Sequence, residues 1–185
     1  MKHNIYILLL VITSGFTQCC KEKPNNNNDN DIPGLPPATQ VGANTFGCLV
    51  NGVPWVPQGN NGGGNNLSIN YDPSFNNGVF SVAAYNAVIS PTSTQYIGIG
   101  VADSLNYFNF PKKLKLSKTS IYRTTASISL LCIIVSTATI ISDGELFIDK
   151  LDKQNRIIAG RFNYTLYQSG CDTVKVTNGS FDMKF

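Results

Sequence analysis

The scarcity of histidine limits the catalytic and metal-binding chemistry that this chain can perform. His3 is the single histidine, and it lies in an N-terminal segment with the composition of an export signal. Without a histidine in the mature chain, the Ser–His and Cys–His pairs that activate a nucleophile cannot form. Histidine-ligated metal sites are excluded for the same reason, and the domain has no C-x-x-C spacing that would indicate zinc. The sequence therefore predicts no metal and no cofactor.

Carboxylates are the remaining groups that could perform acid–base chemistry. Two of them facing each other across a cleft could hydrolyse a glycosidic bond. Most stand beside Gly, Pro or Asn, where turn formation accounts for them. The carboxylates of the domain are Asp72, Asp103, Asp143, Glu145, Asp149, Asp152, Asp172 and Asp182. The sequence favours a protein that is not an enzyme, and a carboxylate-pair hydrolase acting on glycans is the alternative.

The cysteines divide into two groups. Cys19 and Cys20 end the N-terminal segment, whereas Cys48, Cys132 and Cys171 lie in the domain. Cys132 stands inside an apolar run, where a free cysteine behaves as a small hydrophobe. Because an exported domain folds in an oxidising compartment, we predict a disulfide between Cys48 and Cys171, which lie near turns at the two ends of the domain sequence. Three buried thiols are the alternative.

An aromatic loop is the best sequence candidate for a binding surface. It runs from Ser104 to Pro111 and contains Tyr107, Phe108 and Phe110. Exposed rigid aromatic side chains bind ligands at a low cost in conformational entropy. If these rings are exposed, we expect the loop to bind a glycan or a partner protein. The alternative is a loop packed against the core.

The N-terminal residues 1–19 read as a lipoprotein signal peptide. Lys2 and His3 precede the apolar stretch Ile5 to Ile12, which is too short to span a bilayer. Phe16-Thr17-Gln18-Cys19 looks like the box that precedes a lipidated cysteine, so we predict lipid attachment at Cys19, with Cys20 as the alternative. An ordinary secretory signal is the remaining reading. Several acyl chains on one cysteine would anchor the mature chain stably to a membrane.

Composition separates a tether from a single domain. Residues 20–43 are rich in Asn and Pro and predict a disordered tether, and residues 44–185 predict one β-rich domain. The chain is 42% hydrophobic and only 14% charged, and its net charge of +3 falls to +2 when Lys2 leaves with the signal. So weak a charge argues against a nucleic-acid partner.

The domain sequence carries strand and turn signals from end to end. Residues Ile158 to Leu166 alternate apolar and polar side chains, as in a half-buried strand. Asn51-Gly52 and Asn178-Gly179 each predict a two-residue hairpin, the first pairing Val50 with Val53 and the second pairing Val176 with Phe181. Asp143-Gly144 predicts a further turn. About nine or ten short strands without a helical stretch predict an antiparallel β-sandwich or barrel.

Two segments of the domain resemble a family of Bacteroidota-type lipoproteins of unknown function. The resemblance lies in 42–57, which includes Asn44-Thr45-Phe46-Gly47-Cys48-Leu49-Val50-Asn51-Gly52, in 158–164, and in the closing run 172–185. It implies a β-rich fold and a location in the cell envelope, most simply the outer membrane, and it implies no activity. Together with the signal, it leads us to expect a lipid-anchored binding or structural domain.

Overall fold

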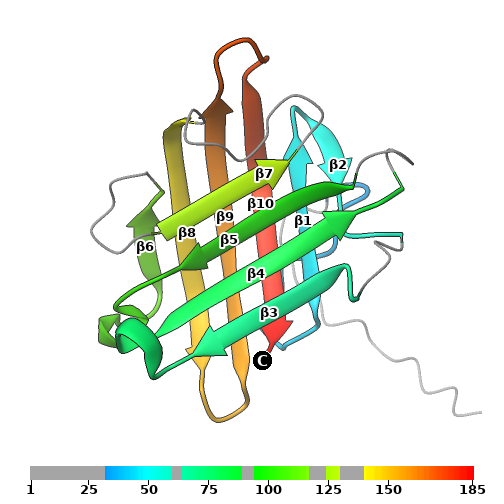
Figure 1. The fold of residues 1–185 in the computed structure, drawn as a ribbon. Coiled ribbons are helices and arrows are strands. Elements are labelled where there is room, and N and C mark those ends of the chain that lie inside the picture. Colours follow the sequence, from blue (N-terminus) through cyan, green and yellow to red (C-terminus); the bar gives the residue numbers. More distant parts are fainter. Residues whose placement is uncertain (1–31, 60–63, 89–93, 117–123, 130–139) are drawn as a thin grey trace, which may run out of the picture. The chain divides into compact units, whose positions relative to one another are not determined.

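The structure is a computed structural model that describes residues 32–59, 64–88, 94–116, 124–129 and 140–185. Its described part contains two antiparallel sheets stacked face to face, which confirms the predicted all-β class and its sandwich form (Figure 1). The strands are β1 (Thr45–Val50), β2 (Val53–Trp55), β3 (Leu67–Asp72), β4 (Val79–Asn86), β5 (Gln95–Val101), β6 (Lys112–Lys115), β7 (Thr124–Ser129), β8 (Ile140–Asp152), β9 (Ile157–Tyr167) and β10 (Val174–Lys184). Two short 3-10 turns, η1 (Phe75–Asn77) and η2 (Leu105–Tyr107), complete the described elements. None of these elements is a helix long and apolar enough to cross a membrane.

The two sheets enclose one hydrophobic core. The larger sheet has the order β2-β1-β10-β9-β8-β6, and the smaller sheet, β3-β4-β5-β7, lies across it in Figure 1. In β4, and in β9 from Phe162 to Leu166, alternate residues are buried, as the period of two requires. The largest side chains of the core include Phe46, Phe80, Phe162 and Phe181. Trp55 joins the sheets, because its buried indole N–H donates to Gln95 Oε1 at 2.8 Å.

The β1–β2 hairpin confirms one predicted turn in full. Val50 lies opposite Val53, and Cys48 lies opposite Trp55. Asn51 and Gly52 both have positive φ, 50° and 83°, as a type I′ turn requires.

The second predicted Asn-Gly hairpin is wrong. β10 runs straight through Asn178 and Gly179, and it pairs with β1 on one side and with β9 on the other. Val176 faces Val50 and Tyr164 rather than Phe181. The register shifts show that Asn178, at φ 52°, is an extra residue in β10. The dipeptide therefore forms a β-bulge, which needs the same left-handed backbone as a hairpin turn.

Asp143-Gly144 also fails as a turn, because it lies inside β8. Gly144 faces Tyr164 across the strand pair, and a Cβ on it would lie 2.7 Å from the Cβ of Tyr164. Glycine serves close packing here rather than chain reversal. The chain reverses after Asp152 instead, in the four-residue turn that brings Asp152 opposite Ile157.

Residues 32–43 of the predicted 20–43 tether belong to the folded domain, because the chain packs on the domain from Ile32 onward, whereas residues 20–31 lie outside the described residues. We call residues 32–44 the strap. A Cβ on Gly47 of β1 would lie 2.7 Å from Pro36, so the absence of a side chain there lets the strap approach the sheet. At its other end, Asn44 Oδ1 accepts the Lys184 N–H at 2.9 Å.

A buried carboxylate holds the middle of the strap. Asp182 is only 1% exposed and accepts hydrogen bonds from Thr39 Oγ1 at 2.6 Å and from the N–H groups of Val41, Gly42 and Ala43 at 3.0, 2.8 and 3.1 Å. Burial raises the pKa of this carboxyl, but the four hydrogen bonds lower it by more, so the pKa lies below its ordinary value.

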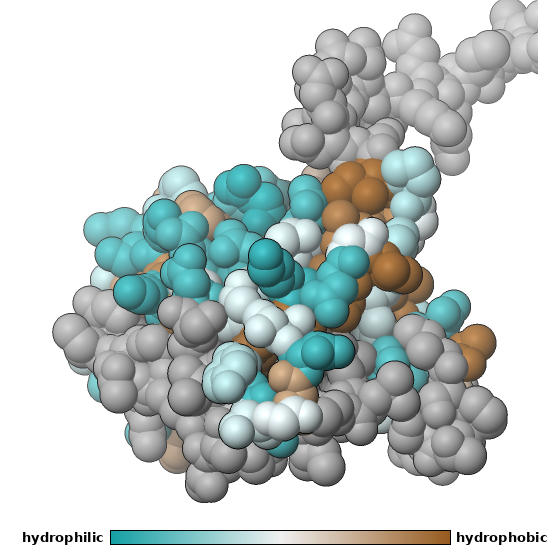
Figure 2. Space-filling view, turned by 90° about the horizontal axis from the view of Figure 1, so that it is seen from above, coloured by the Kyte–Doolittle hydropathy of each residue, from teal (hydrophilic) through white to brown (hydrophobic). Residues whose placement is uncertain are grey.

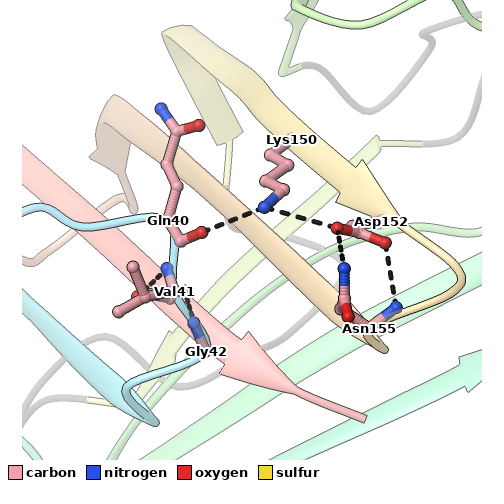
Figure 3. Close-up of polar contacts among 7 residues, drawn as sticks. Gln40, Val41, Gly42, Lys150, Asp152 and Asn155 are labelled. Carbon is pink, nitrogen blue, oxygen red and sulfur yellow. Dashed lines mark hydrogen bonds and ion pairs between the residues drawn. The ribbon is translucent and has the colours of Figure 1, made fainter.

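A lysine links the same strap to the β8–β9 turn (Figure 3). Lys150 Nζ lies 3.3 Å from the Gln40 carbonyl and 3.4 Å from Asp152 Oδ2. Asp152 in turn accepts the backbone and side-chain N–H groups of Asn155 at 2.9 and 2.8 Å. The strap is therefore fixed to β8 as well as to β10.

Neutral and charged polar groups cover much of the described surface. Seen from above in Figure 2, this surface is mainly hydrophilic, with a smaller hydrophobic area to one side. The basic run that begins at Lys112 forms β6, an edge strand of the larger sheet, where Lys113 pairs with Glu145. Edge lysines of this kind oppose pairing with a strand of another molecule.

Candidate functional site

The strongest candidate site is a pair of turns that lie side by side. η1 follows β3 and η2 follows β5, and the two turns contact each other (Figure 1). Three aromatic side chains of the described residues are exposed: Phe75, Tyr107 and Tyr167. Two of the three are on these turns, Phe75 at 59% exposure and Tyr107 at 71%. We call the surface made by Phe75, Asn76, Asn77, Asn106 and Tyr107 the paired-turn platform.

The sequence around η1 dictates a tight, polar turn. Asp72 ends β3, and its Oδ1 accepts the N–H groups of Ser74 at 2.7 Å and Phe75 at 3.2 Å. Asn76 and Asn77 then adopt φ values of 44° and 58°. Asparagine is among the few residues that tolerate this left-handed conformation. Phe75 is thereby held at the tip of the turn, with its ring in solvent.

The first residue of η2 anchors this turn in the hydrophobic core. Leu105 is fully buried in the core, whereas Tyr107, two residues later, is exposed. Ser104, which precedes the turn, has φ 65°, a strained conformation for a serine. Strained backbone of this kind is retained only where neighbouring contacts enforce it, and it is concentrated at functional sites.

Hydrogen bonds lock the two turns together. The Ser104 N–H donates to the Asn76 carbonyl at 2.8 Å, and the Leu105 N–H donates to the Gly78 carbonyl at 3.0 Å. Tyr107 Oη donates to Asn77 Oδ1 at 3.0 Å. Because these bonds connect residues about thirty positions apart, the platform is one preorganised surface rather than two independent loops.

Asn106 completes the connection. Its Nδ2 donates to the Pro73 carbonyl at 2.7 Å, and its Oδ1 accepts from Lys153 Nζ at 3.0 Å. Gly78 lies directly beneath it with φ 99°, and a Cβ there would come within 2.8 Å of the Asn106 side chain. Only glycine fits this position, because both its backbone angle and its neighbour exclude a side chain.

The three predicted aromatic residues have different positions. Tyr107 is exposed, whereas Phe108 and Phe110 are partly buried and pack against the core. The Phe108 and Phe110 rings contact each other edge to face at 6.5 Å, and Lys112 Nζ lies 5.5 Å from the centre of the Phe108 ring. These two rings support the loop, and the exposed surface belongs to Tyr107 and to Phe75, which the sequence did not single out.

Two shallow hollows lie elsewhere, beside the edge strand β3. Their volumes are about 520 and 530 Å³, and they share Asn44, Asn66 and Leu67 as lining residues. Lys184 lines one of them, and neither has an Asp or Glu among its lining residues. These hollows supply amide and apolar contacts but no acid–base pair.

The predicted Cys48–Cys171 disulfide is wrong. Cys48 is a free thiol, fully buried in the core opposite Trp55. Cys171 is disulfide-bonded, and its partner lies outside the described residues. Burial raises the pKa of the Cys48 thiol to about 12, so this thiol stays protonated and a poor nucleophile at neutral pH. Cys132 and the predicted lipid sites Cys19 and Cys20 also lie outside the described residues.

No family model, curated protein or solved structure matches the chain.

Proposed function

We propose that this chain is a lipid-anchored binding protein of the cell envelope, held on the outer membrane by a lipid at Cys19 or Cys20. The location rests on the signal peptide predicted from residues 1–19 and on the resemblance of the sequence to Bacteroidota-type lipoproteins. In this proposal the domain has no enzymatic activity and no nucleic-acid partner, and it binds a glycan or protein ligand through the paired-turn platform.

A single observation carries the binding half of the proposal. Two of the three exposed aromatic side chains in the described part lie on turns that hydrogen bonds lock together. The loops also have the Tyr, Asn, Ser and Gly composition of binding loops, in which rigid rings supply contact area and small polar residues supply adaptable hydrogen bonds. Loops displayed by a rigid β-sandwich are the usual place for such a site.

The alternative hydrolase requires two carboxyl groups about 5–10 Å apart across a cleft. The two hollows beside β3 do not support it, because neither has a carboxylate among its lining residues.

The binding half can be tested without knowing the ligand. Hydrogen exchange of the full chain in isolated envelopes is compared with exchange of the same chain purified in detergent. We expect slower exchange in envelopes for residues 72–78 and 103–110, and no change at the end of β9 around Tyr167. Equal exchange of the platform in both preparations would contradict a binding role.

The anchor is tested by metabolic labelling with an alkyne-tagged fatty acid. We expect the label on the wild type and its loss in Cys19→Ala, or in Cys20→Ala if the alternative site is used. Labelling that survives in the double variant would refute the lipid anchor.

A further inference from the structure

We infer that the ligand of the paired-turn platform is an uncharged carbohydrate chain. This inference rests on the proposed function and names the ligand class for the same site.

The apolar surface is too small for a stable protein partner. One aromatic side chain buries about 150–250 Å² when it is fully covered, and Phe75 and Tyr107 are 59% and 71% exposed, so together they offer about 200–325 Å². A standard protein–protein interface buries about 800 Å² on each partner, of which more than half, about 450 Å², is apolar. Two aromatic rings on neighbouring turns, surrounded by asparagine side chains, suit a ligand that is narrower than a protein surface.

The charges at the platform disfavour an anionic ligand. Asp72 and Asp103 flank the two turns, and each carboxylate is already an acceptor within its own loop, Asp72 from Ser74 and Phe75 and Asp103 from Ser104 Oγ. Among the described residues, Lys153 contacts the platform, and it donates to Asn106. With that lysine engaged and two carboxylates nearby, the described residues of the site form no cluster of cations that would bind a phosphate, sulfate or uronate.

The polar groups that remain match hydroxyl groups. A side-chain amide offers both a donor and an acceptor, which is the combination that a sugar hydroxyl needs. Asn109 follows η2, is exposed and makes no hydrogen bond among the described residues, and Asn77 uses only its Oδ1, toward Tyr107. One face of a pyranose ring carries C–H groups, which pack on the faces of aromatic rings, while the hydroxyls at its rim reach the amides.

The test is affinity electrophoresis of the full chain in detergent, through gels that contain one polysaccharide each. The neutral probes are a β-glucan, a mannan and starch, and the acidic probes are alginate and heparin. We expect retardation by at least one neutral probe and by neither acidic probe. Phe75→Ala and Tyr107→Ala should each weaken the retardation about tenfold or more, as expected for an anchoring aromatic residue.

One variant serves as the control. Tyr167→Ala removes the third exposed aromatic ring of the described residues and leaves the platform unchanged. It should keep the retardation, and the melting temperatures of all three variants should stay close to that of the wild type, because the altered rings are exposed.

The electrophoresis and the hydrogen-exchange experiment together separate a failure of the carbohydrate inference from a failure of the binding function. Retardation by the acidic probes alone, or an equal loss in Tyr167→Ala, overturns the carbohydrate inference. If no probe retards the chain while the platform is protected in envelopes, the carbohydrate inference falls and the binding function stands. If no probe retards the chain and the platform is unprotected in envelopes, both fall.

Discussion

Replacing the buried carboxylate of Asp182 should loosen the strap. In Asp182→Asn, an NH₂ group replaces one of the two carboxylate oxygens and faces an N–H donor that this oxygen had accepted. The other oxygen still accepts hydrogen bonds, but it no longer carries a negative charge. Hydrogen bonds to a charged group contribute about 1.5–3 kcal/mol each. The sum over four bonds overstates the loss, because a detached strap can hydrate its own N–H groups. We therefore expect the free energy of unfolding to fall by about 2–4 kcal/mol.

The assay combines thermal unfolding with limited proteolysis. For a domain of this size, 1 kcal/mol shifts Tm by roughly 2–4 °C, so the expected drop in Tm is about 4–16 °C. A protease should also cut the variant within residues 39–43 faster than it cuts the wild type. Asp172→Asn is the matched control, because Asp172 is exposed and the charge change is the same. If Asp182→Asn and Asp172→Asn melt and digest alike, Asp182 does not hold the strap.

Stability should also depend on pH through this residue. The pKa of Asp182 in the folded chain lies below its ordinary value of about 3.9, so folding favours the ionised form. The stabilisation is complete above about pH 4 and is lost as the pH falls further. The difference in Tm between the wild type and Asp182→Asn should therefore be constant from pH 5 to 7 and shrink below pH 4. A difference that does not change with pH in that acid range would contradict the assignment.

Two further predictions concern the core. The thiol of Cys48, with its pKa raised to about 12, should resist iodoacetamide at pH 8 in the native chain and react once guanidinium unfolds it; Cys171 should react only after reduction. Peptide mass spectrometry reads both sites, and native labelling of Cys48 would show that it is not buried. Gly179→Ala should destabilise the domain by about 1–3 kcal/mol, because its Cβ would lie 2.4 Å from the Phe162 ring. Gly64→Ala, with nothing within 4 Å, should melt like the wild type, and equal melting of the two variants would refute the packing argument.

Much of the fold could be predicted from local pattern, and the two Asn-Gly dipeptides show where such prediction stops. Asn51-Gly52 formed the predicted hairpin because β2, with Pro54 in it, is a short edge strand that only β1 must pair. Asn178-Gly179 has the same turn chemistry, but β10 pairs on both sides of this dipeptide, with β1 from Val176 to Asp182 and with β9 from Val174 to Lys184. A bulge satisfies the left-handed backbone without breaking either ladder. The dipeptide specifies a backbone conformation, and the number of neighbouring strands decides whether the chain reverses there.

The candidate site was predictable only in part, for a similar reason. The aromatic loop was evident in the sequence, and Tyr107 is exposed as a binding residue must be. Sequence alone could not show that Phe108 and Phe110 turn toward the core, or that the β3–β4 turn brings Phe75 next to η2. The signal that could have found Phe75 is its place between Ser74 and two asparagines, where a large apolar residue has no helix or strand to bury it. The role of Asp182 was hidden because its partners lie about 140 residues earlier, in a segment whose composition predicts disorder.

The most direct test of the binding account is photo-crosslinking in living cells. The photoreactive residue p-benzoylphenylalanine replaces Phe75, Tyr107 or Tyr167 in the full chain, and the products are separated on a gel after irradiation. The account predicts slower-migrating products from positions 75 and 107 and none from position 167. Products from position 167 alone, or no products from positions 75 and 107, would show that the paired-turn platform is not the surface with which this protein meets its ligand.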